Sequence, residues 1–239
     1  MRPDLSVTAA ETKIVIRQLE SQHDVRMQVG NALVSEEDFE PWYDNALGEI
    51  DPYYFKRYRK YLEKEKGFSR GVVTAISMDT DKIIRHSGNP RKDGTWDRRG
   101  MVLGHVQSGK TANYTGLVCK AADAGYKLII VIAGMSSDLR NQTQSRLDEG
   151  FVGQESDAFL SGAPARKIGV GKFSLPNDGM EHPPTFTSAT KDFSKGSAEG
   201  LNISLGTLKT PVIFVIKKNQ GILKNLIEWL RVLNTRNDR

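Results

Sequence analysis

The sequence predicts an α/β protein with a parallel sheet, preceded by an N-terminal helical region. Two continuous apolar runs of strand length, residues 127–133 and 211–216, are each followed by a helical pattern. Such runs are typical of parallel strands that are buried on both faces. The third observation is a glycine-rich phosphate-loop pattern at residues 104–111, which opens another helical pattern.

The first region, residues 1–86, is predicted to be entirely helical. Ser35, followed by three acidic residues, resembles a capping box, and Asp51 before Pro52 indicates a further helix start. A loop rich in glycine, asparagine and proline, residues 87–99, is the predicted linker to the core at residues 100–239. Apolar side chains recur at spacings of three and four in two stretches: Ile14, Ile16, Leu19, and Phe39, Trp42, Tyr43, Leu47.

Residues 53–61 interleave aromatic and basic side chains, a composition found on some nucleic-acid-binding surfaces. On a helix, Tyr54, Tyr58 and Tyr61 would share one stripe. The basic side chains would point away from that stripe: Lys56, Arg59 and Lys60. We therefore favour an aromatic core beneath a solvated basic face, with a nucleic-acid surface as the alternative.

Residues 104–111 (GHVQSGKT) match the pattern G-x-x-x-x-G-K-[ST]. An apolar run, residues 101–103, is predicted to be a short buried strand before the loop, and a helix is predicted at residues 112–124. The pattern favours phosphate binding because glycines let main-chain N–H groups line an anion cradle. Lys110 would reach the outer phosphates, and the Thr111 hydroxyl would ligate Mg²⁺.

The loop therefore predicts ATP and Mg²⁺ as cofactors, with Lys110 and Thr111 as the catalytic residues and Thr111 as the metal ligand. The predicted nucleotide-binding residues are Gly104, Gln107, Ser108, Gly109, Lys110, Thr111 and Ala112. Trp96 could stack on the adenine ring, and a packing role is the alternative.

Beyond the first strand, Ser136 or Ser137 is expected to cap a helix at residues 138–147. Residues 148–210 are polar and predict loops, with one short strand near residues 168–170. A helix at residues 219–233 follows the second strand.

The composition excludes several classes of protein. No apolar run approaches the roughly 20 residues of a membrane span, and the N-terminus lacks the apolar segment of a secretory signal, so we expect a cytoplasmic protein without a membrane partner. A net charge of +5 permits a nucleic-acid partner without requiring one. The single Cys119 is expected to be a buried structural thiol, and the four histidines show no metal-ligand spacing.

Residues 96–117 (WDRRGMVLGHVQSGKTANYTGL), with residues 127–134 and 138–149, resemble the bacterial Z-one domain family. These are endonuclease-associated proteins with a superfamily-two helicase-like ATPase core, and residues 210–230 carry a weaker likeness. The resemblance implies a RecA-like core, with residues 104–111 as its first motif and DNA as a partner in restriction or phage defence. It also implies that Arg140, Gln142 and Thr143 contact a nucleic-acid backbone. A solvated helix face is the alternative.

The sequence departs from that family where ATP hydrolysis needs acidic side chains. The strand at residues 212–216 ends in Lys217, Lys218 and Asn219, and the pair Asp148–Glu149 follows a helix. We therefore expect the RecA-like core to be incomplete at its C-terminus, with a C-terminal remainder or a partner protein supplying the missing motifs. Two other functions stay open: a non-catalytic nucleotide-dependent scaffold and a P-loop small-molecule kinase.

Overall fold

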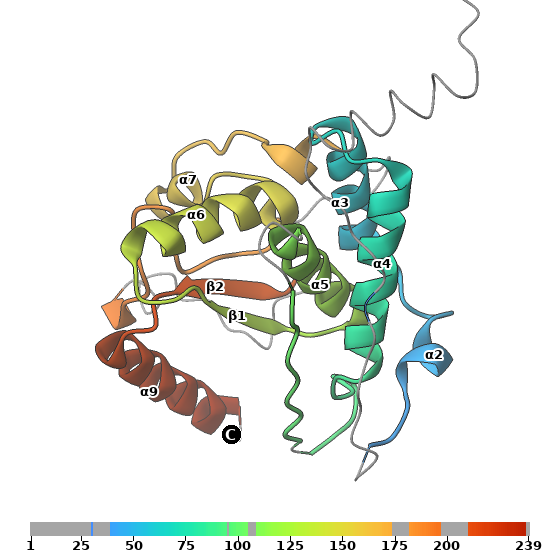
Figure 1. Cartoon of the computed structure of the whole chain (residues 1–239). Helices are drawn as coiled ribbons and strands as arrows, with labels where there is room; N and C mark the ends of the chain where they lie inside the picture. Colours follow the sequence, from blue (N-terminus) through green and yellow to red (C-terminus); the bar gives the residue numbers. More distant parts are fainter. Residues whose placement is uncertain are drawn as a thin grey trace, which may run out of the picture.

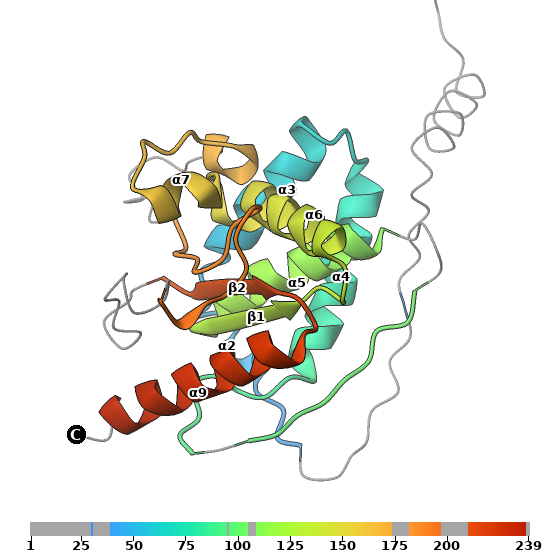
Figure 2. The ribbon, with the colours of Figure 1, turned by 90° about the vertical axis from the view of Figure 1, so that its left-hand side faces the viewer.

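The computed structural model describes residues 30, 39–94, 96–104, 109–173, 182–196 and 210–237, and it shows a mixed helix and strand fold in three layers. Helices α3, α4, α5 and α6 lie on one face of a two-stranded sheet, and α9 lies on the other (Figures 1 and 2). The main elements are α2 (Tyr43–Ala46), α3 (Tyr53–Lys64), α4 (Arg70–Arg85), α5 (Lys110–Ala124), β1 (Leu128–Ile132), α6 (Ser137–Leu147), α7 (Ser156–Ser161), β2 (Val212–Ile216) and α9 (Gln220–Asn237).

Strands β1 and β2 are parallel, with Leu128 opposite Val212 and Ile132 opposite Ile216. All five β2 residues are buried, whereas β1 is half-buried and exposed at its end. The second edge of β2 is covered by residues 182–188: Ile213 N donates to the Pro184 carbonyl at 3.2 Å, and Val215 N donates to Thr187 Oγ1 at 2.9 Å. Both of these strand predictions are confirmed, and the small parallel sheet flanked by helices is compatible with the predicted α/β class.

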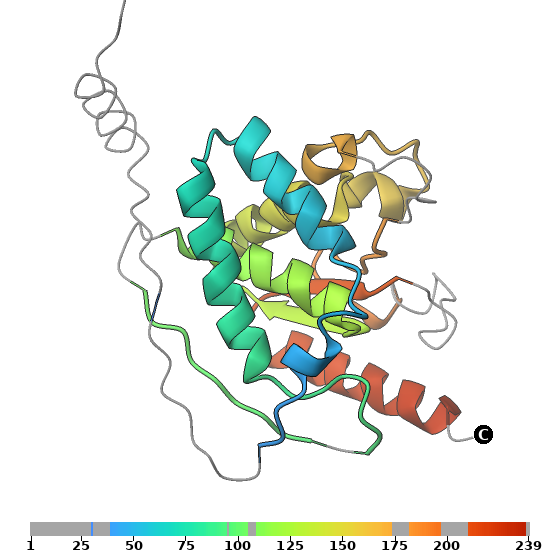
Figure 3. The same ribbon diagram turned by 90° about the vertical axis from the view of Figure 1, so that its right-hand side faces the viewer.

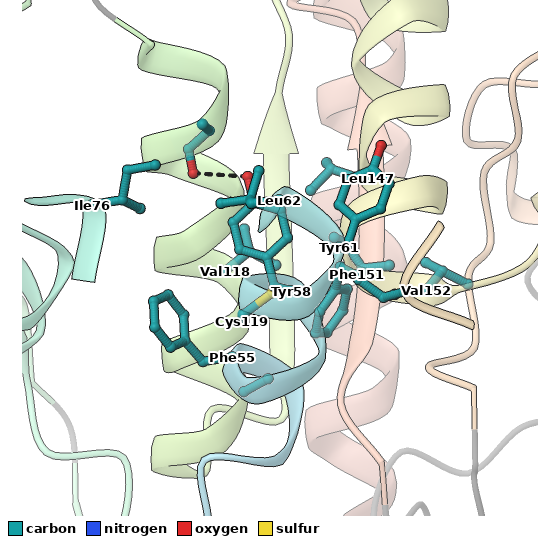
Figure 4. Packing of buried hydrophobic residues seen from close by; sticks show 14 of the residues in the cluster. Phe55, Tyr58, Tyr61, Leu62, Ile76, Val118, Cys119, Leu147, Phe151 and Val152 are labelled. Atoms are coloured by element: carbon teal, nitrogen blue, oxygen red, sulfur yellow. Dashed lines mark hydrogen bonds between the residues drawn. The ribbon is translucent and has the colours of Figure 1, made fainter. Parts of the chain in front are cut away.

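The core around the sheet has two parts because successive side chains of β2 point to opposite faces. Ile213 and Val215 pack in one cluster with residues of α3 and α5, including Phe55, Tyr58 and Cys119 (Figure 4). On the other face, three alternate β2 residues pack with α9 and the segment at residues 182–196: Val212, Phe214 and Ile216. Helices α3, α4 and α5 thus share the first cluster with the sheet.

Helix α5 is the centre of the helical layer and packs against both α3 and α4 (Figure 3). Its Asp123 carboxylate accepts the N–H groups of Tyr54 at 2.8 Å and Phe55 at 3.0 Å, at the start of α3. The predicted cap at Asp51 is therefore wrong, since helix α5 supplies the carboxylate. A cap 69 residues away in sequence leaves no local signal.

Residues 101–103 do not form the predicted buried strand. They belong to no strand, and Met101 is 81 % exposed and Leu103 83 % exposed. A strand needs a neighbour for its N–H and C=O groups, and within the described chain β2 takes its two neighbours from β1 and residues 182–188. Three apolar residues are too few to bring the segment into the sheet without such a partner.

The short strand predicted near residues 168–170 is also wrong. Gly169–Lys172 form a 3₁₀ turn, and only an isolated bridge joins Gln154 to Lys167. The polar region after α6 holds a π-helical turn (η1, Asp148–Val152) and the short helix α7. Helical structure in the first region is confirmed for α2, α3 and α4. The expectations at Ile14, Ile16, Leu19 and Ser35 lie outside the described residues.

The aromatic and basic stretch at residues 53–61 forms α3 as the preferred interpretation predicts. Tyr58 and Tyr61 are buried, and the side chains of Lys56, Arg59 and Lys60 are exposed. One basic residue of the stretch, Arg57, is unexpectedly 0 % exposed, with its Nε donating to the Val170 carbonyl at 3.2 Å. The stretch therefore builds the core and leaves no aromatic stripe for stacked bases.

Candidate phosphate-binding site

The candidate site is the N-terminus of α5, where Gly109 precedes the first helical residue, Lys110. Gly109 has φ 73° and ψ 21°, a left-handed conformation that favours glycine over any residue with a Cβ. It has no side chain to cap the helix, and the first N–H groups of an α-helix lack intrahelical acceptors. The start of α5 therefore has the backbone arrangement and partial positive charge that suit an anion.

Lys110 brings the two ends of the glycine-rich loop together. Its exposed side chain donates from Nζ to the Gly104 carbonyl at 3.1 Å. The first and last parts of the pattern, Gly104 and Gly109–Lys110, are thus neighbours in space. Gln107 and Ser108, which are predicted to bind nucleotide, lie outside the described residues.

The next two residues are held by other helices. Thr111 is half-buried, and its Oγ1 accepts a hydrogen bond from Arg146 of α6 at 3.0 Å. Ala112 is buried, and its carbonyl accepts from the Tyr58 hydroxyl at 3.0 Å (Figure 4). Tyr58 and Arg146 therefore position the first turn of α5 from two different helices.

The donor set fits Mg²⁺ that arrives with a phosphate ligand. Within the described residues, no group of three or more His, Cys, Asp or Glu side chains could hold a metal ion. Mg²⁺ typically binds one or two protein oxygens and completes its shell with phosphate oxygens and water. The Thr111 hydroxyl could be such an oxygen, whereas a metal site built wholly from protein ligands is not formed by the described residues.

Arg140 is a structural residue, contrary to the expectation of a nucleic-acid contact. It is 2 % exposed, and its Nη2 donates to the Ser188 carbonyl at 2.6 Å and to the Ala189 carbonyl at 2.9 Å. Its Nη1 donates to the Val215 carbonyl at 3.3 Å. Arg140 thus ties α6 to β2 and to the segment beside it, and a buried guanidinium with these partners cannot also reach a nucleic-acid phosphate.

The other two α6 residues differ in exposure. Thr143 is 7 % exposed, and its Oγ1 donates to the Leu139 carbonyl at 2.7 Å, which leaves little of the side chain accessible for the predicted contact. Gln142 is exposed, which leaves its side chain accessible for the predicted contact. The buried face of α6 is largely polar, so apolar spacing in the sequence does not reveal it. Its residues are Arg140, Thr143, Gln144 and Leu147.

The acidic pair Asp148–Glu149 lies in the π-helical turn η1, which follows helix α6 and not a strand. Asp148 is 4 % exposed and accepts from Gln144 Nε2 at 2.9 Å and from Ser156 Oγ at 2.6 Å. Burial raises the pKa of Asp148 to about 6, although these donors oppose the shift. Glu149 accepts from the Tyr61 hydroxyl at 2.5 Å. Both carboxylates therefore have structural partners.

A cavity of about 470 Å³ lies beside this pair, and its lining carries both signs of charge. Its cations are matched in ion pairs: Lys66 with Glu149 at 3.0 Å, and Arg166 with Glu155 at 3.2 Å. Five carboxylates and three cations line the cavity, so it does not suit a phosphate: Glu65, Asp148, Glu149, Glu155, Asp157, Lys66, Arg166 and Lys172.

Trp96 packs at the opposite end of α5. Its ring meets that of Tyr126 edge-on, with centroids 6.0 Å apart, just after the last turn of the helix. The 15 residues of α5 span about 22 Å at 1.5 Å per residue. A nucleotide whose phosphates occupy the N-terminus cannot extend its base that far, so the packing alternative holds for Trp96.

Comparison with protein-family models, with curated protein sequences and with solved structures gives no match to this chain. Among the described helices, none combines the length and the apolar character needed to cross a membrane. Cys119 is 0 % exposed in the core, and burial raises the pKa of its thiol, as expected for a structural cysteine.

Proposed function

We propose that this chain binds Mg-ATP at the N-terminus of α5 and is the ATP-binding lobe of a helicase-like, DNA-acting ATPase. One observation carries the nucleotide part: a left-handed Gly109 stands directly before a 15-residue helix, with Lys110 folded back onto Gly104. The helix side of the phosphate-loop pattern is therefore present, whereas the strand that normally precedes such a loop is not formed by residues 101–103.

The position of the helix in the fold supports the proposal. Residues 125–127 lead from the end of α5 into β1, so the start of α5 lies toward the carboxyl ends of the two strands (Figure 2). Ligands of open α/β sheets bind outside the carboxyl ends of the strands. Tyr58 and the packing of α3 and α4 hold α5 rigidly, which keeps its N-terminal N–H groups in place for a ligand.

Each residue then has a defined task. The N–H groups at the start of α5 bind phosphate oxygens, and Lys110 exchanges its bond with the Gly104 carbonyl for an outer phosphate. The Thr111 hydroxyl is the protein ligand for Mg²⁺, and the metal ion would neutralise part of the phosphate charge. Gly104, Gln107, Ser108 and Ala112 complete the proposed nucleotide-binding set.

The wider function rests on the resemblance of residues 96–149 to the Z-one domain family. In this proposal the protein belongs to an endonuclease-associated restriction or phage-defence system with DNA as its substrate. Gln142 is the exposed α6 residue that could contact the strand. A C-terminal remainder or a partner protein would complete the RecA-like core and supply the acidic hydrolysis motif.

A non-catalytic scaffold is the second candidate, and a specific observation favours it. Strand β2 is followed by Lys217 and Lys218, and Lys217 Nζ donates to Ser137 Oγ at 3.1 Å. The buried Asp148 and its neighbour Glu149 are engaged by structural partners. The Asp192 carboxylate lies at the carboxyl end of β2, where its Oδ2 accepts from Lys217 N at 3.3 Å, so it too has a structural partner. These carboxylates are engaged by the fold and do not form the acidic pair that orients an attacking water.

Calorimetric titration of Mg-ATP into the wild-type chain and Lys110→Ala tests the site. We expect a loss of about 100-fold or more in affinity for the variant, because a phosphate would lose a charged hydrogen-bond donor. Lys60→Ala removes an exposed lysine of α3 and is the matched control. Equal affinities for the wild-type chain and Lys110→Ala would refute the site.

An ATPase assay separates the two candidate functions. We expect turnover near background for the isolated chain, with or without DNA, because an acidic hydrolysis motif is missing from its described strands. Adding a C-terminal remainder or partner that restores DNA-stimulated turnover would support the ATPase. Nucleotide binding that persists without turnover in the complete system would support the scaffold.

A further inference from the structure

Arg146 lies in the last turn of α6 and reaches the loop from a helix that the phosphate-loop pattern does not include. Its Nη1 is 3.0 Å from Thr111 Oγ1, across 35 residues of sequence. The side chain is exposed, and it makes no ion pair with any residue that the structure describes. Its charge therefore lies beside the first turn of α5, and the carboxylates in the described part of the chain do not pair with it.

The surroundings of Arg146 carry further positive charge. The N-terminus of α5 carries the positive end of the helix dipole, and Lys110 adds a full positive charge beside it. Arg146 adds a guanidinium beside the first turn of α5, which makes the local potential more positive and favours an anion there.

We propose that Arg146 is a second phosphate-binding cation of this site, acting on the outer phosphates of the nucleotide together with Lys110. This inference rests on the proposed nucleotide site. A guanidinium has five N–H donors, and the described contacts of Arg146 use one of them. Its planar fork suits phosphate oxygens, so where Mg²⁺ takes the Thr111 hydroxyl the guanidinium would exchange that oxygen for an outer phosphate.

Arg140, on the same helix, has a different environment from Arg146. Arg140 donates to the main-chain carbonyls of Ser188, Ala189 and Val215 and is buried among them. Arg146 is exposed and has one described acceptor, the Thr111 hydroxyl. The two arginines are six residues apart in sequence. The guanidinium of Arg140 is hydrogen-bonded within the core, whereas that of Arg146 lies at the candidate ligand site.

Calorimetry with Mg-ATP on the wild-type chain, Arg146→Gln and Arg146→Lys tests the inference. A hydrogen bond to a charged group contributes about 1.5–3 kcal/mol, so we expect Arg146→Gln to weaken binding by about tenfold to hundredfold. Arg146→Lys keeps the charge and loses the fork, so a smaller loss is expected. The matched control is Arg59→Gln, which removes an exposed arginine on α3 that pairs with Glu63.

The dependence of affinity on salt distinguishes phosphate contact from a structural role. If Arg146 contacts phosphate, the affinity of Arg146→Gln falls less steeply with added salt than that of the wild-type chain, because one charge pair is missing. A residue that only joined α6 to α5 would lower the melting temperature and leave this slope unchanged.

The outcomes distinguish a failure of the Arg146 role from a failure of the proposed nucleotide site. Wild-type binding that Lys110→Ala abolishes, together with unchanged affinity and salt slope in Arg146→Gln, would overturn the role of Arg146 and leave the site standing. Absence of nucleotide binding by the wild-type chain would overturn both. If Arg146→Gln does not fold, Arg146→Lys is decisive: a measurable loss of affinity supports the inference, and wild-type affinity with a wild-type salt slope refutes it.

Discussion

The charged side chains at the two ends of α5 have opposite environments: one is buried and paired, and the others are exposed. Near the C-terminal end, Lys120 is 6 % exposed, and its ammonium pairs with Asp81 at 2.6 Å, donates to the Ser77 carbonyl at 2.7 Å and lies over the Phe55 ring. At the N-terminal end, Lys110 is exposed, and Arg146 has no carboxylate partner among the described residues.

The difference shows how one helix can serve both stability and binding. Burying a charge is costly unless it is paired and hydrogen-bonded, so Lys120 needs the partners that α3 and α4 provide. Exposed cations beside a helix N-terminus stay in water and can take an anion from solution. The buried end holds α5 rigidly, and that rigidity keeps the exposed end arranged for a ligand.

Substituting the buried lysine should have the largest effect on stability. Lys120→Met keeps most of the stem and removes the ammonium, which leaves Asp81 and the Ser77 carbonyl without this donor. We expect the free energy of unfolding to fall by about 2–4 kcal/mol in urea titrations. The matched change at an exposed site, Lys60→Met, should shift it by less than about 0.5 kcal/mol. Equal effects at the two lysines would contradict the contrast between buried and exposed charge.

The pH dependence of stability should report on Asp123 at the same buried end. Burial raises its pKa from 3.8 to about 7, against the hydrogen bonds from Tyr54 and Phe55. Between about pH 4 and pH 7 the folded chain therefore keeps a proton that the unfolded chain has released. The free energy of unfolding should fall as pH rises through this interval.

Asp123→Asn should flatten that dependence, as measured by urea unfolding at several pH values. A smaller slope should remain, because burial also raises the pKa of Asp148, to about 6. The control Asp93→Asn, at an exposed site, should keep the full wild-type slope. Parallel pH profiles for the wild-type chain and Asp123→Asn would show that the pKa of Asp123 is not raised in the fold.

The same methionine substitution at the exposed end should separate binding from stability. Lys110→Met should change the free energy of unfolding by no more than about 0.5 kcal/mol, since the side chain is exposed. Its effect should appear in the affinity for Mg-ATP instead. A loss of stability comparable to that of Lys120→Met would mean that Lys110 has a structural role.

The smallest effect is expected in the segment that leads into the loop. Leu103 is 83 % exposed, so Leu103→Ser should leave the thermal midpoint within about 1–2 °C of the wild-type value. Leu62→Ser, in the core at 3 % exposure, is the positive control for a buried leucine. A large drop for Leu103→Ser would indicate that residues 101–103 are buried in solution.

Elements with strong local patterns could be predicted from the sequence. The apolar runs at β1 and β2 are strands because their side chains on both faces enter the core, as the absence of alternation indicates. The run at residues 101–103 has the same character and is exposed, because a strand also depends on a neighbour elsewhere in the chain. The cap of α3 by Asp123 was missed for a similar reason.

At the candidate site, the sequence by itself determined the local parts: a glycine able to adopt a left-handed conformation, a lysine after it and a helix behind them. These depend on residue type and on neighbours along the chain. Only the tertiary structure decided that Arg146 lies at Thr111 while Arg140 is buried against main-chain carbonyls. The environment of a long charged side chain depends on which distant segments pack around it, and no spacing within α6 records that.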